Sequence, residues 1–555
     1  MLRTFWLLLI FMILGGSTFA QIEYFERYAF TDKDSVRGTY GPLRSNYDLH
    51  SYDMDITIDP ERRFLSGAIT FHASATEDLK KVQADLYENM DVLAITSGKN
   101  ELKYTRLFNA IYVEFPKTVK SGSDFSFTIQ YQGKPREARN APWDGGFVWK
   151  KDLDGNPWIG VACEGDGASL WWPCKDHPLD EPDSMHIKIA VPNGLTCVSN
   201  GNLVGKSPKG KDYTQWHWRV GYPINNYNVT VNIANYAHFK DIYVSPDGDS
   251  LDCDYYVLPY NLEKARKQFK QVGPMLDCYD RFLGPYPFWE DGFCMVETPY
   301  LGMEHQSAIA YGNNYKRGYM GGMQADGQDW DYIIIHESGH EWFGNAVSAK
   351  DHGDMWIHEG FTTYMEALYA ECMYGFQGAI DHLNQEKPLI RNIEPIIGPY
   401  EVAWDKFRSS DHYMKGTWIL HTLRNAMGDD EKWFAILKGF YNTYKYQTIA
   451  TSDFEAYLNE KSGRDWSAVL KQYLRYKDLP QMEIELKAKR NDLEVRYRWV
   501  ADVEGFDLPV QFGKKGSYVR AFPTEKWQKM ELKNMSPDEF EFPIDLFLVS
   551  LEMND

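Results

Sequence analysis

Cysteine and basic charge are both scarce in this chain of 555 residues. The seven cysteines are odd in number, too dilute for a disulfide scaffold, and none has zinc-finger spacing. We therefore assign no metal to cysteine, expect most thiols to be buried and free, and leave open which of them form one or two bridges. Lysine and arginine total 59 against 79 acidic residues, a net charge of −20. That balance excludes a nucleic-acid-binding protein, which relies on a basic surface.

Long apolar runs are also missing, except at the N-terminus. A short start carrying Arg3 precedes an apolar run over 5–14, and small residues follow at 18–20. This pattern predicts a secretory signal peptide over 1–20 and a mature chain from about Gln21, secreted or periplasmic. The run is shorter than the roughly 20 residues of a membrane span, so we expect no integral span after signal removal. An uncleaved anchor is the alternative.

Apolar and polar residues alternate along much of the chain from about residue 45 to 245. Tyr52, Met54, Ile56 and Ile58 form one such run, and similar runs lie at 64–71, 125–129 and 186–191. Period-two alternation broken by Gly, Pro and Asn is typical of half-buried strands. The sequence predicts an all-β domain over residues 21–247.

Helical spacing begins near residue 250. We expect helices over 262–283 and 411–427, the second ending at Gly428, and a capping box at Ser452–Glu455 opening a later one. Alternation returns after Pro480. The fold class is therefore multidomain α+β, with a mainly α domain over 248–478 and a small C-terminal β-sandwich domain over 479–555.

One pentapeptide carries metal chemistry: His336-Glu337-Ser338-Gly339-His340. On a helix its two histidines lie one turn apart on one face and can share a metal, while Glu337 reaches water beside it. Glu359 follows 19 residues later and would return on a second helix. Two His and one Glu leave a tetrahedral position open, the pattern of a catalytic zinc site with one Zn²⁺ per chain. Two surface histidines on a helix are the alternative.

The flanking residues favour two helices. Asp331 is a plausible N-cap for the first, and Gly344-Asn345 is a suitable stop. Asp354 would cap the second, expected over about 355–371. Glu366 lies seven residues after Glu359 on the same face, so it is our candidate to accept the other N–H of a ligand histidine. A solvent-facing glutamate is the alternative.

These residues stand within longer motifs. The segments 336–345 and 356–361 resemble the M1 family of zinc aminopeptidases, gluzincins that include leukotriene A4 hydrolase and aminopeptidase N. Upstream, Leu301–His305 resembles that family's Gly-x-Met-Glu-Asn motif, and downstream Tyr413–Gly416 resembles its Tyr-x-Lys-Gly motif. Glu164 stands nine residues before Pro173, where the family has an acidic or amide residue.

The resemblance implies a role for each matching residue. Glu304, with Glu164 as a neighbour, would bind the substrate's free α-amine, and Gly302 and Met303 would line the same site. Tyr413 would donate its phenol O–H to the developing oxyanion. The implied fold is an N-terminal β-sandwich or saddle domain, a thermolysin-like catalytic domain and a small C-terminal β-sandwich.

This chain also departs from the family pattern. Leu301 and His305 replace the usual Gly and Asn, Ser169 stands where many members have Arg, and His358 replaces the usual Asn. His305 and His358 are weak candidates for extra zinc ligands, because the ligand set is already complete. We do not expect the large helical fourth domain of many members, so the cleft would be open or closed by a partner subunit.

The sequence therefore predicts a secreted zinc metalloaminopeptidase that hydrolyses the N-terminal bond of peptides with a free N-terminus. One alternative is an endopeptidase or dipeptide-releasing metallopeptidase with the same zinc site. Another is a non-catalytic peptide-binding scaffold, although such a protein should have lost ligands or the base. The epoxide hydrolase activity of one family member has no support in these residues.

Overall fold

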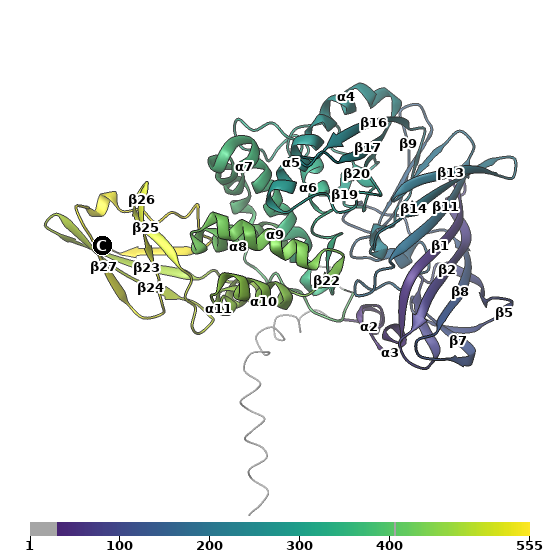
Figure 1. Ribbon diagram of the computed structural model, residues 1–555, viewed down its shortest axis with the longest axis horizontal. Helices are drawn as coiled ribbons and strands as arrows, with labels where there is room; N and C mark the ends of the chain where they lie inside the picture. Colours follow the sequence, from purple (N-terminus) through teal and green to yellow (C-terminus); the bar gives the residue numbers. More distant parts are fainter. Residues whose placement is uncertain (1–29, 404–406, 555) are drawn as a thin grey trace, which may run out of the picture.

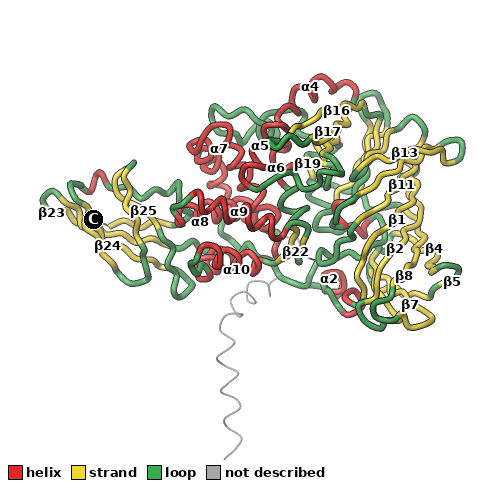
Figure 2. The backbone as a smooth tube through the Cα atoms, in the orientation of Figure 1, coloured by secondary structure: helices red, strands yellow, loops and turns green. Residues whose placement is uncertain are grey.

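The computed structural model describes residues 30–403 and 407–554. The expected signal peptide and the mature start at Gln21 lie outside the described residues. A strand-rich N-terminal region, a helical middle region and a strand-rich C-terminal region follow one another along the long axis of the molecule (Figure 1). Figure 2 shows the same division by secondary structure. The predicted α+β architecture, with a β-rich N-terminal domain and a helical domain after it, is confirmed.

The N-terminal region is built on an eight-stranded mixed sheet in the order β13-β14-β11-β1-β2-β8-β4-β5. At its centre β1 (Tyr47–Asp59) pairs antiparallel with β2 (Phe64–Ala75) and parallel with β11 (Ser184–Pro192). The four apolar residues predicted to alternate in β1 are all buried, as a half-buried strand requires. The other strands are β4 (Met90–Ser97), β5 (Asn100–Glu101), β8 (Asp124–Gly133), β13 (Asn202–Lys209) and β14 (Tyr213–Val220).

Two smaller sheets complete this region. One, in the order β12-β15-β10-β9, joins β9 (Gly146–Lys151), β10 (Pro157–Ala162), β12 (Thr196–Val198) and β15 (Asn232–Ala234). The other joins β3 (Leu79–Asp85), β7 (Ala110–Val119) and β6 (Lys103–Leu107). Short helices α2 (Asp32–Gly38) and α3 (Pro42–Ser45) precede the strands. The 3₁₀ turn η2 (Asn226–Asn228) and the loop after β10 bring this region to the functional site.

The middle region contains a five-stranded sheet, order β16-β17-β18-β20-β19, beside a group of helices. The strands are β16 (Ala237–Val244), β17 (Ser250–Val257), β18 (Phe293–Glu297), β19 (Gly302–Met303) and β20 (Ile309–Tyr311). The helices are α4 (Leu262–Gln268), α5 (Val272–Phe282), α6 (Tyr332–Gly339), α7 (Trp356–Glu386), α8 (Asp411–Met427), α9 (Asp430–Tyr444), α10 (Thr451–Ser462) and α11 (Ser467–Arg475). Strands β21 (Val347–Ala349) and β22 (Gln447–Ile449) form a short parallel pair.

The prediction for α8 is confirmed, whereas the predictions for residues 262–283 and for the start of α10 need correction. Helix α8 has the predicted bounds, and Gly428 ends it in the left-handed conformation with φ 65°. The single helix expected over 262–283 is α4 and α5 with a 3₁₀ turn between them. The capping box at Ser452 is wrong: α10 is capped at Ala450, whose N–H donates to the Asp453 carboxylate at 2.8 Å.

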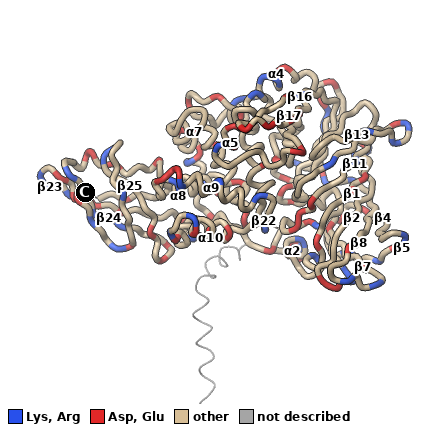
Figure 3. Tube along the Cα trace, viewed as in Figure 1, with Lys and Arg blue, Asp and Glu red and all other residues tan. Residues whose placement is uncertain are grey.

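The C-terminal strands share their core with the helices. A four-stranded sheet contains β27 (Gln528–Leu532), β24 (Asp492–Val500), β23 (Gln481–Lys489) and β28 (Ser550–Asn554), beside the hairpin β25 (Val510–Lys514) and β26 (Ser517–Ala521). One continuous hydrophobic cluster runs from the helical region into these strands. Figure 3 shows acidic and basic residues in all three regions. None of the described helices is long and apolar enough to cross a membrane.

Candidate metal centre and substrate site

Three side chains from two helices converge on one point. His336 and His340 lie one turn apart at the C-terminal end of α6, with their Nε2 atoms 3.2 Å apart. Oε2 of Glu359, in the first turn of α7, lies 3.5 Å from Nε2 of His336 and 3.3 Å from Nε2 of His340. All three residues are buried. The structure thus brings together the three residues proposed as ligands.

The hydrogen bonds of the two histidines fix which nitrogen faces this point. Nδ1 of His336 lies 2.6 Å from Oε1 of Glu366, and Nδ1 of His340 lies 3.0 Å from the carbonyl oxygen of Phe343. Because a carbonyl and a carboxylate only accept, each Nδ1 carries the proton and each Nε2 presents a lone pair.

These two lone pairs face one buried carboxylate oxygen, Oε2 of Glu359, which has no hydrogen-bond donor among the described residues. Such a set of donors is stabilised by a cation between them. Two imidazole nitrogens and a carboxylate fit zinc in both type and number.

Local sequence explains the end of α6. The Asp331 side chain caps the helix by accepting from the Ile333 N–H, as predicted. The regular helix ends at Gly339, earlier than the stop expected at Gly344, and wider turns follow, with the Asn345 N–H donating to the His340 carbonyl. Gly344 has φ +124°, and a Cβ there would lie 3.0 Å from Nδ1 of His340. A side chain at 344 would therefore displace the His340 ring.

Helix α7 differs from the prediction at its start. Asp354 does not cap it, because its Oδ1 accepts from the hydroxyls of Tyr400 and Thr451. The range to Glu386 consists of two helices that meet at Gly375, and the first ends before that glycine, close to the end predicted near residue 371. Gly375 interrupts it with φ 76°, so the chain bends there and continues. The bend matters because the second half carries residues that reach back to the metal centre.

Behind the ligands lies a buried polar network. Glu366, which accepts from His336, has its second oxygen 3.3 Å from Nε2 of His382, and that nitrogen is 3.5 Å from Oε1 of Glu386. All four residues are buried. The structure thus places Glu366 against His336 and adds two residues, His382 and Glu386, that sequence reasoning missed. The sequence offered one sign of this pair: His382 and Glu386 are four residues apart, so on a helix after Gly375 they share one face.

Glu337 lies beside the cluster and close to the strand β19. A Cβ at Gly302 would collide with Oε1 of Glu337, so a side chain there would displace that carboxylate. Burial, opposed by the nearby His336, raises the pKa of Glu337 to about 8 in the absence of a metal. A cation on the neighbouring ligands would lower that pKa, because it favours the carboxylate form. Glu337 is therefore placed to take up and release a proton.

Glu304 follows β19 directly and faces Glu164, which lies two residues beyond the end of β10. Ligating atoms of Glu304, Glu164 and His358 lie within 4.8 Å of one another. The Glu304 backbone carbonyl accepts from Nδ2 of Asn345 at 2.8 Å. Burial and the charge of Glu304 raise the pKa of Glu164 well above its ordinary value. Two facing carboxylates repel each other, so a cation between them relieves the pair.

Tyr413 enters the site from the first turn of α8. Its ring lies 6.0 Å from that of His336, centroid to centroid, at 22°. Burial and the charge of Glu359 raise its pKa well above the ordinary value, so the phenol keeps its proton. A protonated phenol beside the cluster is a hydrogen-bond donor.

One cavity of about 760 Å³ connects most of these groups. Its lining comes from both the N-terminal and the helical regions and includes Glu164, Gly302, Met303, Glu304, His336, Glu337, His340, Glu359 and Tyr413. The structure thus gathers every proposed site residue except Glu366 on one cavity wall, with Glu366 behind it.

The residues that depart from the family motifs, Leu301, His305 and His358, have different surroundings. Leu301 lines the cavity. His305 is buried, and burial lowers its pKa to about 3, yet it joins no group of possible metal ligands among the described residues. His358 lies beside Glu164 and Glu304 instead of the cluster of His336, His340 and Glu359. Tyr227, which bonds to Glu304, had no sequence signal because it lies 77 residues away in the β-rich region.

Two family models match this chain. Residues 260–473 match the "Peptidase family M1 domain" and residues 49–227 match the "Peptidase M1 N-terminal domain". The chain belongs to peptidase family M1. The matched ranges include the cluster of His336, His340 and Glu359 and the two carboxylates Glu164 and Glu304. Zinc is the cofactor implied for the site, and the donor set fits it.

Related proteins agree with this family assignment. Mouse aminopeptidase B is 26% identical over 309 residues, covering 52% of this chain and 44% of that protein. Leucyl aminopeptidase of Saccharolobus solfataricus is 23% identical over 432 residues, covering 72% of this chain and 51% of that protein. The chain thus spans about half the length of these curated relatives.

Solved structures share the fold. An M1 zinc metallopeptidase from Deinococcus radiodurans has a TM-score of 0.65 at 19% identity, covering 78% of this chain and 94% of that one. A mutant of the Deinococcus enzyme bound to a Tyr-Ser-Ala substrate has the same TM-score at 18% identity, covering 79% and 96%.

Proposed function

We propose that this M1 peptidase is a zinc aminopeptidase that removes the N-terminal residue from peptides with a free α-amine. The observation that carries the proposal is the pair of carboxylates, Glu164 and Glu304, on the same cavity as the cluster of His336, His340 and Glu359. An internal peptide bond has no ammonium group for these carboxylates to bind. The geometry therefore favours an exopeptidase over an endopeptidase with the same metal chemistry.

His336, His340 and Glu359 would hold the zinc ion. When bound, zinc supplies Lewis-acid polarisation of the scissile carbonyl and of the attacking water. Glu337 takes a proton from that water and later passes it to the leaving amine, as a general base and then a general acid. Gly302 leaves the Glu337 carboxylate open to the cavity. Burial favours uptake of that proton, because it destabilises the charged carboxylate of Glu337.

Tyr413 stabilises the negative charge that develops on the carbonyl oxygen. Its O–H lies in a buried site with a pKa held high, so the group donates without losing its proton. One donor of this kind contributes about 10²–10³ in rate.

Glu304 and Glu164 bind the substrate ammonium and set the distance from the N-terminus to the scissile bond. Charge-assisted hydrogen bonds to two carboxylates are stronger than neutral ones. Only the first peptide bond then reaches the metal and Glu337, so one residue is released at a time. Gly302 and Met303 line the cavity beside this anchor.

We also propose that the enzyme acts outside the cytoplasm, as a secreted or periplasmic protein. The signal-peptide pattern over residues 1–20 supports this location. Cys278 and Cys372 form a disulfide, a bond typical of oxidising compartments. The other five cysteines are buried and free.

Leucine p-nitroanilide and its N-acetylated form test the proposed activity. The zinc-loaded enzyme should cleave the free-amine substrate, and acetylation should abolish cleavage, because it removes the ammonium. Glu304→Gln should lower kcat/KM for the free amine while zinc content stays at one per chain. Equal cleavage of both substrates would instead indicate an endopeptidase, and absence of both zinc and hydrolysis would indicate a binding scaffold.

A further inference from the structure

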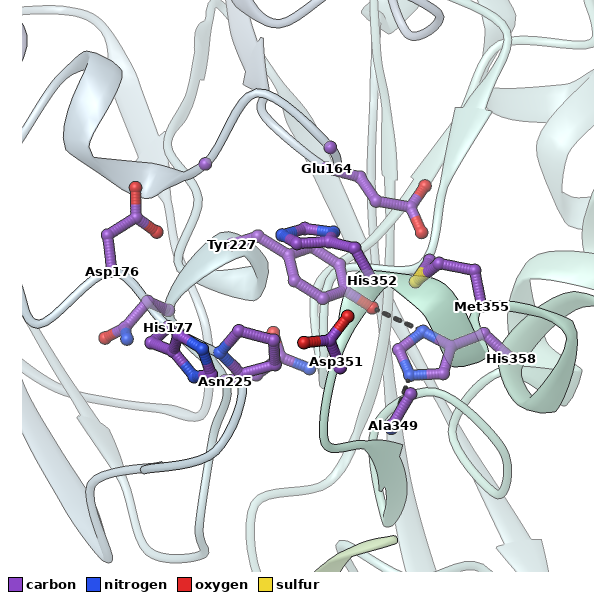
Figure 4. A pocket seen from close by; sticks show the side chains of 14 residues that line it. Glu164, Asp176, His177, Asn225, Tyr227, Ala349, Asp351, His352, Met355 and His358 are labelled. Carbon is purple, nitrogen blue, oxygen red and sulfur yellow. Dashed lines mark hydrogen bonds between the residues drawn. The ribbon is translucent and has the colours of Figure 1, made fainter. Parts of the chain in front are cut away.

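A directed chain of hydrogen bonds ends on the amine-site glutamate. The hydroxyl of Tyr227, on η2 of the N-terminal region, donates to Oε1 of Glu304 at 3.0 Å. The same hydroxyl lies 3.4 Å from Nδ1 of His358, on α7. Nε2 of His358 lies 2.9 Å from the backbone nitrogen of Ala349, at the end of β21. Figure 4 shows Tyr227, His358 and Ala349 in this sequence, with Glu164 nearby.

The chemistry of the end groups fixes the direction of every bond. The Ala349 N–H can only donate, so Nε2 of His358 must present its lone pair. In the neutral ring the proton is then on Nδ1, which donates to the Tyr227 oxygen. That oxygen uses its own hydrogen toward the Glu304 carboxylate. The three bonds therefore run one way, from the β21 backbone to Glu304.

This tautomer also excludes a second metal among these residues. Glu164, Glu304 and His358 lie close enough together to bind an ion. Both ring nitrogens of His358 are already committed, however, one as an acceptor from Ala349 and one as a donor to Tyr227. The ring has no lone pair to offer toward the carboxylates, so a neutral orienting role fits and ligation does not.

We propose that Tyr227 and His358 are positioning residues that aim the Glu304 carboxylate at the substrate's α-ammonium. The inference rests on the proposed aminopeptidase function. One Glu304 oxygen is held by Tyr227, and the backbone of Glu304 is held by Asn345. The other carboxylate oxygen, with an unpaired buried oxygen of Glu164, then faces the ammonium.

The β-rich N-terminal region contributes directly to the proposed ammonium-binding site. It supplies Glu164 from the loop after β10 and Tyr227 from η2, while the helical region supplies Glu304 and His358. The Tyr227 O–H also offsets part of the repulsion between the two carboxylates, because its hydrogen bond stabilises the negative charge on Glu304. Holding the carboxylate in place before binding lowers the ordering cost of capturing the ammonium.

Tyr227→Phe tests the role with the ring, and hence its packing, retained. We expect KM for leucine p-nitroanilide to rise about tenfold, the scale of one charge-assisted hydrogen bond, with kcat changed far less. His358→Leu should act in the same direction. Tyr236→Phe is the matched control, because Tyr236 is a buried tyrosine of the same region whose hydroxyl bonds to the Glu297 carbonyl. It should leave KM unchanged.

A double-mutant cycle separates positioning from general damage. In a Glu304→Gln background, Tyr227→Phe should cause little further loss, because Tyr227 acts through the Glu304 carboxylate. Full loss in both backgrounds, or a kcat effect without a KM effect, would overturn the proposal. So would wild-type kinetics for Tyr227→Phe.

Binding of isopentylamine, measured by calorimetry with isopentanol as the uncharged control, distinguishes this inference from the proposed function. If the enzyme cleaves no peptide substrate yet binds isopentylamine, and Tyr227→Phe weakens that binding, the positioning role stands and the aminopeptidase proposal fails. If the enzyme cleaves free-amine substrates and Tyr227→Phe binds isopentylamine as tightly as wild type, the positioning role fails alone.

Discussion

Gly360 of α7 and Gly416 of α8 meet backbone to backbone. A Cβ built on Gly416 would lie 2.8 Å from the Cα of Gly360, and one built on Gly360 would lie 3.0 Å from the Cα of Gly416. This close crossing fixes two functional groups relative to each other. Glu359 precedes one glycine directly, and Tyr413 lies one turn before the other.

We therefore expect Gly416→Ala to damage both stability and catalysis. Overpacking at a contact this tight costs about 1–3 kcal/mol, and pushing the helices apart moves Tyr413 from the cluster of His336, His340 and Glu359. Thermal unfolding and kcat for leucine p-nitroanilide measure the two effects. Gly273→Ala in α5 is the control, since nothing lies within 4 Å of its Cβ position. It should be neutral or slightly stabilising, and a wild-type Gly416→Ala enzyme would contradict the packing argument.

Glu337→Gln should nearly abolish turnover while zinc stays bound. Glutamine keeps the size of the side chain but cannot take the proton from water, a loss of about 10²–10⁴ in rate. The ligands of the metal are untouched, so atomic absorption should still find one zinc per chain. Full activity in the zinc-loaded variant would remove Glu337 from the mechanism.

Glu366→Gln should weaken zinc binding. The charged acceptor fixes the orientation of His336 and increases its basicity, and loss of such a partner typically costs about 10–100-fold in metal affinity. Competition with a chelator measures this. Glu371→Gln on the same helix is the control, because Glu371 bonds to Arg424 instead. Equal zinc affinity in the two variants would show that Glu366 only fills space.

The disulfide between Cys278 and Cys372 should stabilise the helical region. It joins α5 to α7 across 94 residues of sequence, and closing a loop of this size typically contributes about 2–5 kcal/mol. Reducing agent should therefore lower the unfolding temperature of the wild type. The double variant Cys278→Ser, Cys372→Ser should start at the lower temperature and show no response to reductant. If reductant still lowered the unfolding temperature of the double variant, the stabilisation would not come from this disulfide.

Asp291 should make stability depend on pH. Burial raises its pKa to about 6, even though its carboxylate accepts from the Gly221 N–H at 3.0 Å. Because this pKa lies above the unfolded value of 3.8, the folded state holds the proton more tightly. The contribution to stability is complete below pH 3.8 and is lost as pH rises through 6.

Asp291→Asn checks this sign, since the amide stays neutral at every pH. The unfolding temperature of the variant relative to wild type should rise between pH 4 and pH 7. A difference that does not change with pH would contradict the assignment.

Local sequence was sufficient to predict those strands, helix ends and caps that depend only on residues a few positions apart. The alternation in β1, the bounds of α8 and the cap at Asp331 all follow from side-chain period, a left-handed glycine and a short acidic side chain. It failed at Asp354 and Ser452. The Asp354 carboxylate accepts hydrogen bonds from the hydroxyls of Tyr400 and Thr451, which are distant in sequence, instead of capping the helix. At α10 the helix begins earlier than the capping pattern suggested.

The sequence by itself brought the two proposed histidine ligands together, because His336 and His340 owe their common face to the period of one helix. It also placed Glu359 and Glu366 two turns apart. Only the tertiary structure decided what surrounds them. His382 and Glu386 reach Glu366 through the bend at Gly375, and Tyr227 reaches Glu304 from another region of the chain. The physical reason is that helix geometry relates residues a few positions apart, whereas contacts between regions depend on how their buried surfaces fit together.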